Sequence, residues 1–87
     1  GGDGKSARTL YEKMLARHPA NADALRGLAE LAVAAGDYKD AIRRLRDLRQ
    51  HHPRDVEAGL MLVRTLLSAN DLQAARADLE ALRRHHP

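Results

Sequence analysis

The 87-residue sequence contains no cysteine, phenylalanine or tryptophan, and its only aromatic residues are two tyrosines. The lack of cysteine excludes disulfides, thiol catalysis and cysteine-bound zinc. Valine and isoleucine together number four, and so few β-branched and aromatic side chains argue against a sheet protein. No apolar run approaches the roughly 18 residues of a membrane-spanning helix, which excludes membrane insertion by this segment. The apolar residues that remain are mainly leucine and alanine, which suit closely packed helices.

The sequence repeats with a period of about 34 residues, a length typical of helical repeat proteins. Pro19, Pro53 and Pro87 are equally spaced at that interval, and a histidine precedes each of them. The same offset superposes further sets of identical residues, among them Ala7, Ala41 and Ala75; Leu28 and Leu62; Asp37 and Asp71; Leu48 and Leu82; and Arg49 and Arg83. The chain therefore divides into a half-unit, residues 1–19, and two whole units, residues 20–53 and 54–87.

Within a unit the apolar residues recur with the period of an α-helix, as at Leu25, Leu28 and Leu31. Each unit reads as two helices, which we term the first and the second helix of a repeat, and the half-unit supplies a second helix. The pattern predicts an all-α protein with about five helices, at residues 5–17, 22–35, 38–51, 56–69 and 72–85.

The turn inside each unit carries residues that end one helix and begin the next. Gly36 can adopt a positive φ at the end of a first helix, and Asp37 is a good N-cap for the second. Asn70 and Asp71 hold the same places in the next unit, and asparagine also tolerates the left-handed region. Asn21 and Asp55 are predicted to cap the two first helices.

With these features the chain resembles the tetratricopeptide repeat family along nearly its whole length. The matching positions in the first whole repeat are Ala29, Gly36-Asp37-Tyr38, Ala41 and Pro53; in the second they are Leu62, Ala75 and Pro87; in the half-repeat they are Gly2-Asp3, Ala7, Tyr11 and Pro19. The resemblance implies a solenoid of antiparallel helix pairs wound in a right-handed superhelix.

The sequence departs from the family pattern at several positions. The bulky residue near the start of the first helix becomes Leu25 in one repeat and Gly59 in the other. The small residue of the first helix becomes Val63 in the second repeat. The late alanine of the second helix is replaced throughout, by Met14, Leu48 and Leu82. These replacements predict less close packing of the second helices and make the last repeat the more divergent one.

The resemblance also implies a groove, lined by the first helices, that binds a peptide or a partner helix. The residues at the groove positions are Asp23, Arg26, Glu30, Val33 and Ala34 in one helix and Glu57, Leu60, Arg64, Leu67 and Ser68 in the other. Chaperone-binding members of the family carry a Lys/Asn clamp for a peptide carboxylate, whereas Arg26, Glu30 and Met61 stand here, which argues against such a clamp. The alternative is that these residues form only a solvated surface.

Other kinds of site are disfavoured. The five histidines lie at the ends of second helices and lack the i, i+4 spacing of a helical metal site. A cationic side chain at the end of a helix interacts favourably with the helix dipole and can bond the last carbonyls, which explains the histidines without a metal. Gly2-Asp3-Gly4-Lys5-Ser6 looks like the end of a phosphate-binding loop, but it fits the repeat's turn equally well and no strand precedes it.

A nucleic-acid partner is likewise disfavoured. The arginines of 43–49 are interleaved with Asp40 and Asp47, which stand at helical pairing distance, and the chain lacks aromatic platforms for bases. No nucleophile–base pair and no carboxylate dyad stands out, so the sequence predicts neither an enzyme nor a bound cofactor.

The sequence is thus interpreted as an interaction module whose partner is a protein or peptide. Twelve arginines against three lysines indicate a GC-rich bacterial source, and the family resemblance adds roles in assembly, secretion or envelope biogenesis. The alternative function is a structural spacer or a homo-oligomerisation segment. Because both ends are second helices with apolar residues, we expect them to be covered by further repeats or by self-association.

Overall fold

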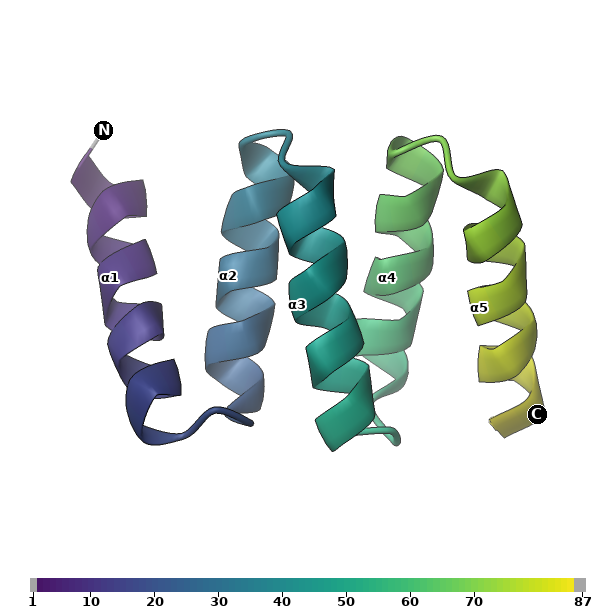
Figure 1. Ribbon diagram of the computed structural model, residues 1–87, viewed down its shortest axis with the longest axis horizontal. Helices are drawn as coiled ribbons and strands as arrows, with labels where there is room; N and C mark the ends of the chain where they lie inside the picture. The colour runs from purple at the N-terminus through teal and green to yellow at the C-terminus, as the bar shows by residue number, and fades with distance from the viewer. Residues whose placement is uncertain (1, 86–87) are drawn as a thin grey trace.

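The computed structural model describes residues 2–85, and every regular element in that range is an α-helix. The helices are α1 (Gly2–Arg17), α2 (Ala22–Ala34), α3 (Tyr38–His51), α4 (Val56–Ser68) and α5 (Leu72–His85). They stand in chain order and alternate in direction, with α2 and α3 forming one hairpin and α4 and α5 the next (Figure 1). The molecule is an elongated slab of 38 × 26 × 14 Å. The predicted all-α architecture of antiparallel helix pairs is confirmed.

The observed helix bounds agree with the prediction within one residue at each end, except at the start of α1. Helix α1 is predicted to begin near residue 5, with Gly2-Asp3 in a turn. This prediction is wrong, because the helix already begins at Gly2. An acidic residue is favourable in a first helical turn, where it faces the positive end of the helix dipole. The segment Gly2–Ser6 is therefore part of α1. His86 and Pro87, which close the predicted last repeat, lie outside the described residues.

The turns inside the two hairpins have the same backbone conformation. Gly36 has φ of 77° and Asn70 has φ of 61°, both in the left-handed region. The amide of Asp37 donates to the carbonyl of Ala32 at 2.8 Å, and the amide of Asp71 donates to that of Leu66 at 2.9 Å. These bonds satisfy carbonyls that the end of a helix leaves unpaired. The predicted turn chemistry is therefore confirmed in both repeats.

Replacing Gly36 by alanine is expected to lower the free energy of unfolding by about 1–2 kcal/mol, because a Cβ penalises the left-handed conformation. No neighbouring atom lies within 4 Å of the position that this Cβ would take, so the loss comes from the backbone alone. Urea unfolding followed by circular dichroism measures the change. Gly36→Asn serves as the control and should lose less, since asparagine already occupies this conformation at Asn70. Equal stability of wild type and Gly36→Ala would contradict the positive φ.

Four leucines fill the centre of the molecule and are almost completely buried: Leu25, Leu45, Leu48 and Leu66. Around them the helices meet through small residues, among them Ala29, Ala41, Ala58 and Ala75. The core is continuous across the two hairpins, because α3 packs against α4 as well as against α2. An alanine at such a contact lets two helices approach closely, which explains how an alanine-rich chain can build a dry core.

Two departures from the family pattern lie next to each other in the second hairpin. A Cβ built on Gly59 would lie 2.7 Å from Cδ1 of Leu82 and 3.3 Å from Cζ of Arg49. Leu82, which stands where the family has alanine, therefore occupies space that a side chain at Gly59 would need. The second repeat thus has a small residue on the first helix beside a large residue on the second, whereas the first repeat has leucine at both positions, Leu25 and Leu48.

Candidate functional site

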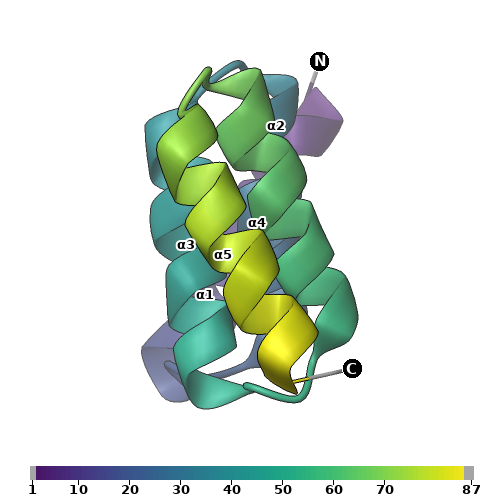
Figure 2. The same cartoon turned by 90° about the vertical axis from the view of Figure 1, so that its right-hand side faces the viewer.

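The eight predicted groove residues lie on two helices, and we call this set the first-helix face: Asp23, Arg26, Glu30 and Val33 of α2 with Glu57, Leu60, Arg64 and Leu67 of α4. In each helix their spacing of three, seven and ten positions keeps them on one side. Figure 2 shows α2 and α4 on the same side of α3. All of these residues are exposed except Arg26 and Val33, which are half-buried.

The apolar part of the first-helix face lies on α4. Leu60 is 43% exposed and Leu67 is 50% exposed, with Arg64 between them on the same side of the helix. At the same repeat positions α2 carries Arg26 and Val33, so its surface is less apolar. Two large leucines exposed two turns apart form an apolar stripe, which we call the α4 stripe.

Arg26 does not stand free on the first-helix face, because it pairs with Asp55. Its guanidinium donates a hydrogen bond to Oδ2 of Asp55, which immediately precedes α4. Asp55 also accepts a hydrogen bond from the amide of Ala58 at 3.0 Å and thereby caps α4. Asp23 approaches Arg26 only at 4.0 Å and remains largely exposed. Arg26 therefore links the two repeats. The sequence predicted Asp55 as a cap, but it held no signal for this pairing.

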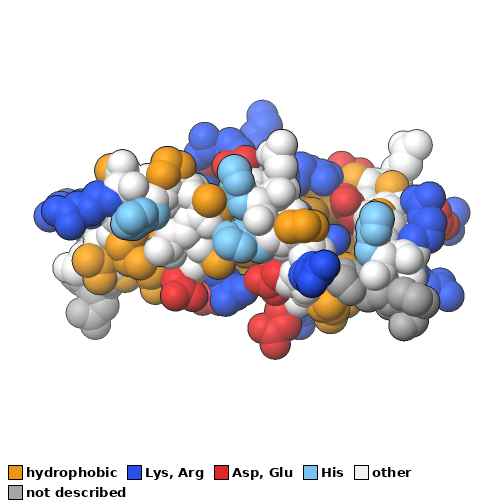
Figure 3. All heavy atoms as spheres, turned by 90° about the horizontal axis from the view of Figure 1, so that it is seen from below, with side chains coloured by type: hydrophobic (Ala, Val, Ile, Leu, Met, Phe, Trp, Pro, Cys, Tyr) orange, Lys and Arg blue, Asp and Glu red, His pale blue; other side chains and the backbone are white. Residues whose placement is uncertain are grey.

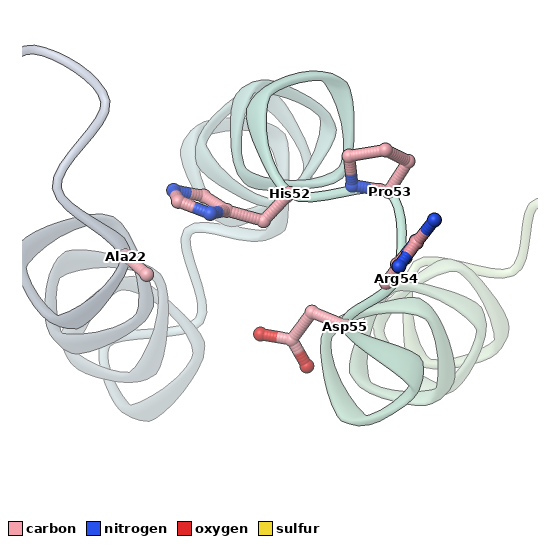
Figure 4. Close-up of a pocket in the computed structure, with 5 residues that line it drawn as sticks. All are labelled: Ala22, His52, Pro53, Arg54 and Asp55. Atoms are coloured by element: carbon pink, nitrogen blue, oxygen red, sulfur yellow. The ribbon is translucent and has the colours of Figure 1, made fainter.

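The junction between the two hairpins contains two further links (Figure 4). Nε2 of His52 donates to the carbonyl oxygen of Ala20 at 2.6 Å, and the ring points toward α2 across a shallow hollow lined by Ala22 and Asp55. Nη1 of Arg49 donates to the carbonyl oxygens of Pro53 and Asp55, at 3.0 and 3.1 Å. The carbonyl that His52 bonds belongs to the preceding junction and not to the end of its own helix, so the histidine ties the end of the repeat 20–53 to its start.

Replacing His52 by alanine is expected to lower the free energy of unfolding by about 1 kcal/mol, because the half-buried carbonyl of Ala20 loses its donor. The adjacent His51→Ala is the matched control and should change stability by less than about 0.5 kcal/mol, since His51 is exposed. Chemical denaturation of both variants at slightly alkaline pH measures the difference. Equal effects of the two substitutions would show that the bond to Ala20 contributes nothing.

The histidines do not gather into a metal site within the described residues. In Figure 3, which views the molecule from the end that carries the junctions, histidine side chains lie at separate places along its length. Among residues 5–85, no three His, Asp or Glu side chains come together as a metal ion requires. In the part of the chain that the structure describes, no helix has the length and the apolar character needed to cross a bilayer.

Basic residues concentrate on α1, α3 and α5, which are the second helices of the repeats. Twelve of the 15 lysines and arginines lie there, against six acidic residues, whereas α2 and α4 carry two basic and three acidic residues. Part of this charge is paired, since Asp40 contacts Arg43 and Arg44, and Arg46 binds Asp78 across α3 and α5. The hydrogen bond that Arg43 donates to Asp40 raises the pKa of Arg43 above its usual value. The second helices are therefore basic, and the first helices are not.

Helical hairpins that recur at a fixed interval and join through equivalent positions define an α-helical repeat protein. The model of the tetratricopeptide repeat family matches residues 1–49 and again residues 32–87, and the chain belongs to this family. The resemblance seen in the sequence is thus confirmed. Tetratricopeptide repeats are protein–protein interaction modules, which identifies the general class of partner.

Two curated bacterial proteins are similar to about half of the chain. Cellulose synthase operon protein C of Escherichia coli (strain K12) is 48% identical over 46 residues, which make up 53% of this chain and 4% of that protein. Putative cellulose synthase operon protein C of Escherichia coli O157:H7 is 46% identical over 46 residues, with the same coverage. The matched part thus spans only a small fraction of the length of these relatives.

Proposed function

We propose that the chain is a scaffold module that binds a peptide or a partner helix through the first-helix face and has no catalytic activity of its own. The observation that carries the proposal is the α4 stripe. A surface that serves only to contact water has no need of Leu60 and Leu67 two turns apart on one side, and apolar side chains grouped in this way are typical of helix and peptide docking sites.

The relatives suggest a setting for this module. Both are named as products of a cellulose synthase operon, and both are far longer than the part that this chain matches. We propose that the chain belongs to a larger bacterial protein for assembly, secretion or envelope biogenesis, and the relatives' names favour a role beside a cellulose synthase. In that setting the repeats hold other proteins in place and leave the chemistry to them.

Selection of peptides tests the proposed binding. A library of displayed peptides of about 15 residues, enough for four helical turns, is panned against the whole chain, and affinities are measured by fluorescence anisotropy. Leu60→Ser and Leu67→Ser are expected to weaken binding roughly tenfold each, since each removes about 1–2 kcal/mol of apolar contact. Leu72→Ser is the control, because Leu72 is also exposed but lies on α5. Peptides that are equally sensitive to all three substitutions, or no peptide above background, would contradict the proposal.

A second candidate function is homo-oligomerisation through α5, and one observation favours it. Leu79 is 39% exposed, whereas Leu45 at the same position of the preceding repeat is completely buried against α4. Leu72 is exposed at the start of the same helix. If these leucines associate, sedimentation velocity will show a concentration-dependent dimer that Leu79→Ser abolishes. A monomer at several hundred micromolar would exclude this function and leave the first proposal intact.

A further inference from the structure

We infer that the first-helix face selects a partner segment that is basic as well as apolar, an inference that rests on the proposed function. In the sequence this surface has a mixed charge, with two arginines against three acidic residues. In the structure Arg26 is bonded to Asp55, which lies outside the face, and the pair is electrically neutral. The charges that remain on the surface are those of Asp23, Glu30, Glu57 and Arg64, and their sum is negative.

The acidic residues of the first-helix face are divided between α2 and the first turn of α4. Arg26 bonds the residue that caps α4, so the N-terminal half of α2 lies next to the start of that helix. Asp23 and Glu30 are two turns apart on the outer side of α2, and Glu57 occupies the first turn of α4 before Leu60. The face thus has an apolar stripe on α4, one acidic residue in the first turn of that helix and two more on the exposed side of α2. Such a surface fits an amphipathic segment with leucine-like side chains on one side and lysine or arginine at its edge.

Charge and apolar contact have different effects on this binding. An exposed pair of opposite charges changes affinity by roughly two- to fivefold, so the acidic residues add little strength individually. They act mainly on selectivity, because a segment with like charges in the same place is repelled and loses its desolvated contacts. The leucines therefore determine how tightly a segment binds, and the carboxylates determine which segments bind.

The basic second helices reinforce this selectivity. The chain as a whole has a net charge of +3, and that charge comes from α1, α3 and α5. At physiological ionic strength, charges more than about 8 Å away are largely screened, so a segment on the first-helix face responds mainly to the carboxylates it touches. An acidic segment is attracted to the second helices instead. The two signs of charge should thus direct oppositely charged peptides to different sides of the molecule.

Three synthetic peptides test the inference on the full chain. They have roughly 18 residues, or five helical turns, share leucines at i, i+3 and i+7, and carry mainly lysine, glutamate or glutamine elsewhere. In anisotropy titrations at physiological ionic strength, we expect the lysine peptide to bind at least tenfold more tightly than the glutamate peptide. Glu30→Gln should weaken the lysine peptide about threefold and Glu30→Lys about tenfold. The control Glu80→Gln, at an exposed position on α5, should stay within twofold.

The outcomes separate this inference from the proposed function. If Leu60→Ser weakens all three peptides but Glu30→Lys changes none, the face binds peptides without a preference for basic ones, and the inference is wrong while the proposed function stands. If the lysine peptide binds and neither substitution affects it, its site lies elsewhere and both are wrong. If no peptide binds, the inference is likewise overturned. Because Glu30 and Leu60 are exposed, circular dichroism should show all variants folded.

Discussion

Leu45→Ala is expected to lower the free energy of unfolding by about 3 kcal/mol, the typical cost of removing a completely buried leucine. Leu45 has no exposed surface and lies in the continuous core where α3 meets α4. The substitution leaves a cavity at the contact that joins the two hairpins, so the repeats should also lose cooperativity. Urea unfolding monitored by circular dichroism gives the free energy, and a lower slope of the transition would report uncoupled hairpins.

The matched control for Leu45→Ala is the same substitution at the same repeat position. Leu79 lies one repeat later, in α5, and is 39% exposed. Leu79→Ala should cost about 1 kcal/mol, since a half-exposed leucine loses less apolar contact and leaves no enclosed cavity. The ratio of the two losses reports burial alone, because the residue type, the helix position and the substitution are identical. Equal losses would contradict the placement of α4 against α3.

Asp55→Ala is expected to lower the free energy of unfolding by about 2 kcal/mol, because one carboxylate both caps a helix and pairs with an arginine. Oδ1 accepts the amide of Ala58 and caps α4, and loss of an N-cap costs about 1 kcal/mol. Oδ2 accepts the guanidinium of Arg26, and this half-buried pair adds roughly another 1 kcal/mol. Thermal and urea unfolding both measure the sum.

Two further variants divide this loss between its causes. Asp71, which caps α5, is exposed. Asp71→Ala should therefore lower the free energy of unfolding only by the contribution of the cap. Asp55→Asn keeps a side chain that caps helices well but removes the charge, so it should lose only the part that belongs to Arg26. If Asp55→Ala costs no more than Asp71→Ala, the link between α2 and α4 contributes nothing to stability.

The pairing of Asp55 also connects stability with binding. Asp55→Asn leaves Arg26 charged and unneutralised on the first-helix face, which then loses half of its net negative charge. The lysine peptide should therefore bind this variant about two- to threefold more weakly, although Asp55 does not belong to the face. A substitution at a repeat junction would in this way change the choice of partner.

The sequence predicted the helices and turns of this protein well because these depend on local features. The repeat period, the apolar spacing within each unit and the residues at the turns each act within one repeat or between neighbours in the chain. Gly36 and Asn70 adopt positive φ, and Asp37, Asp55 and Asn21 accept hydrogen bonds from the amides of the helices they cap. The one wrong boundary, at α1, concerned Gly2-Asp3, where the turn of the repeat pattern was extended to residues that are helical in the structure.

The groove residues could be placed on one face from their spacing, but their charge could not be derived in the same way. Arg26 and Arg64 are the same residue type on equivalent helices, and the sequence treats them alike. Only the packing of α2 beside the start of α4 brings Arg26 to Asp55, 29 residues away, while Arg64 remains exposed. An ion pair between repeats depends on the distance between side chains that no local pattern encodes.

The sequence by itself determined that the chain is a tetratricopeptide repeat protein and which helices it forms. Tertiary structure alone decided three matters: that Gly59 makes room for Leu82, that His52 bonds the preceding junction, and that Arg26 is neutralised by Asp55. The physical reason is one of range. Helices and turns follow from interactions between residues close together in the chain, whereas the charge and shape of the binding face follow from contacts between helices that only packing brings together.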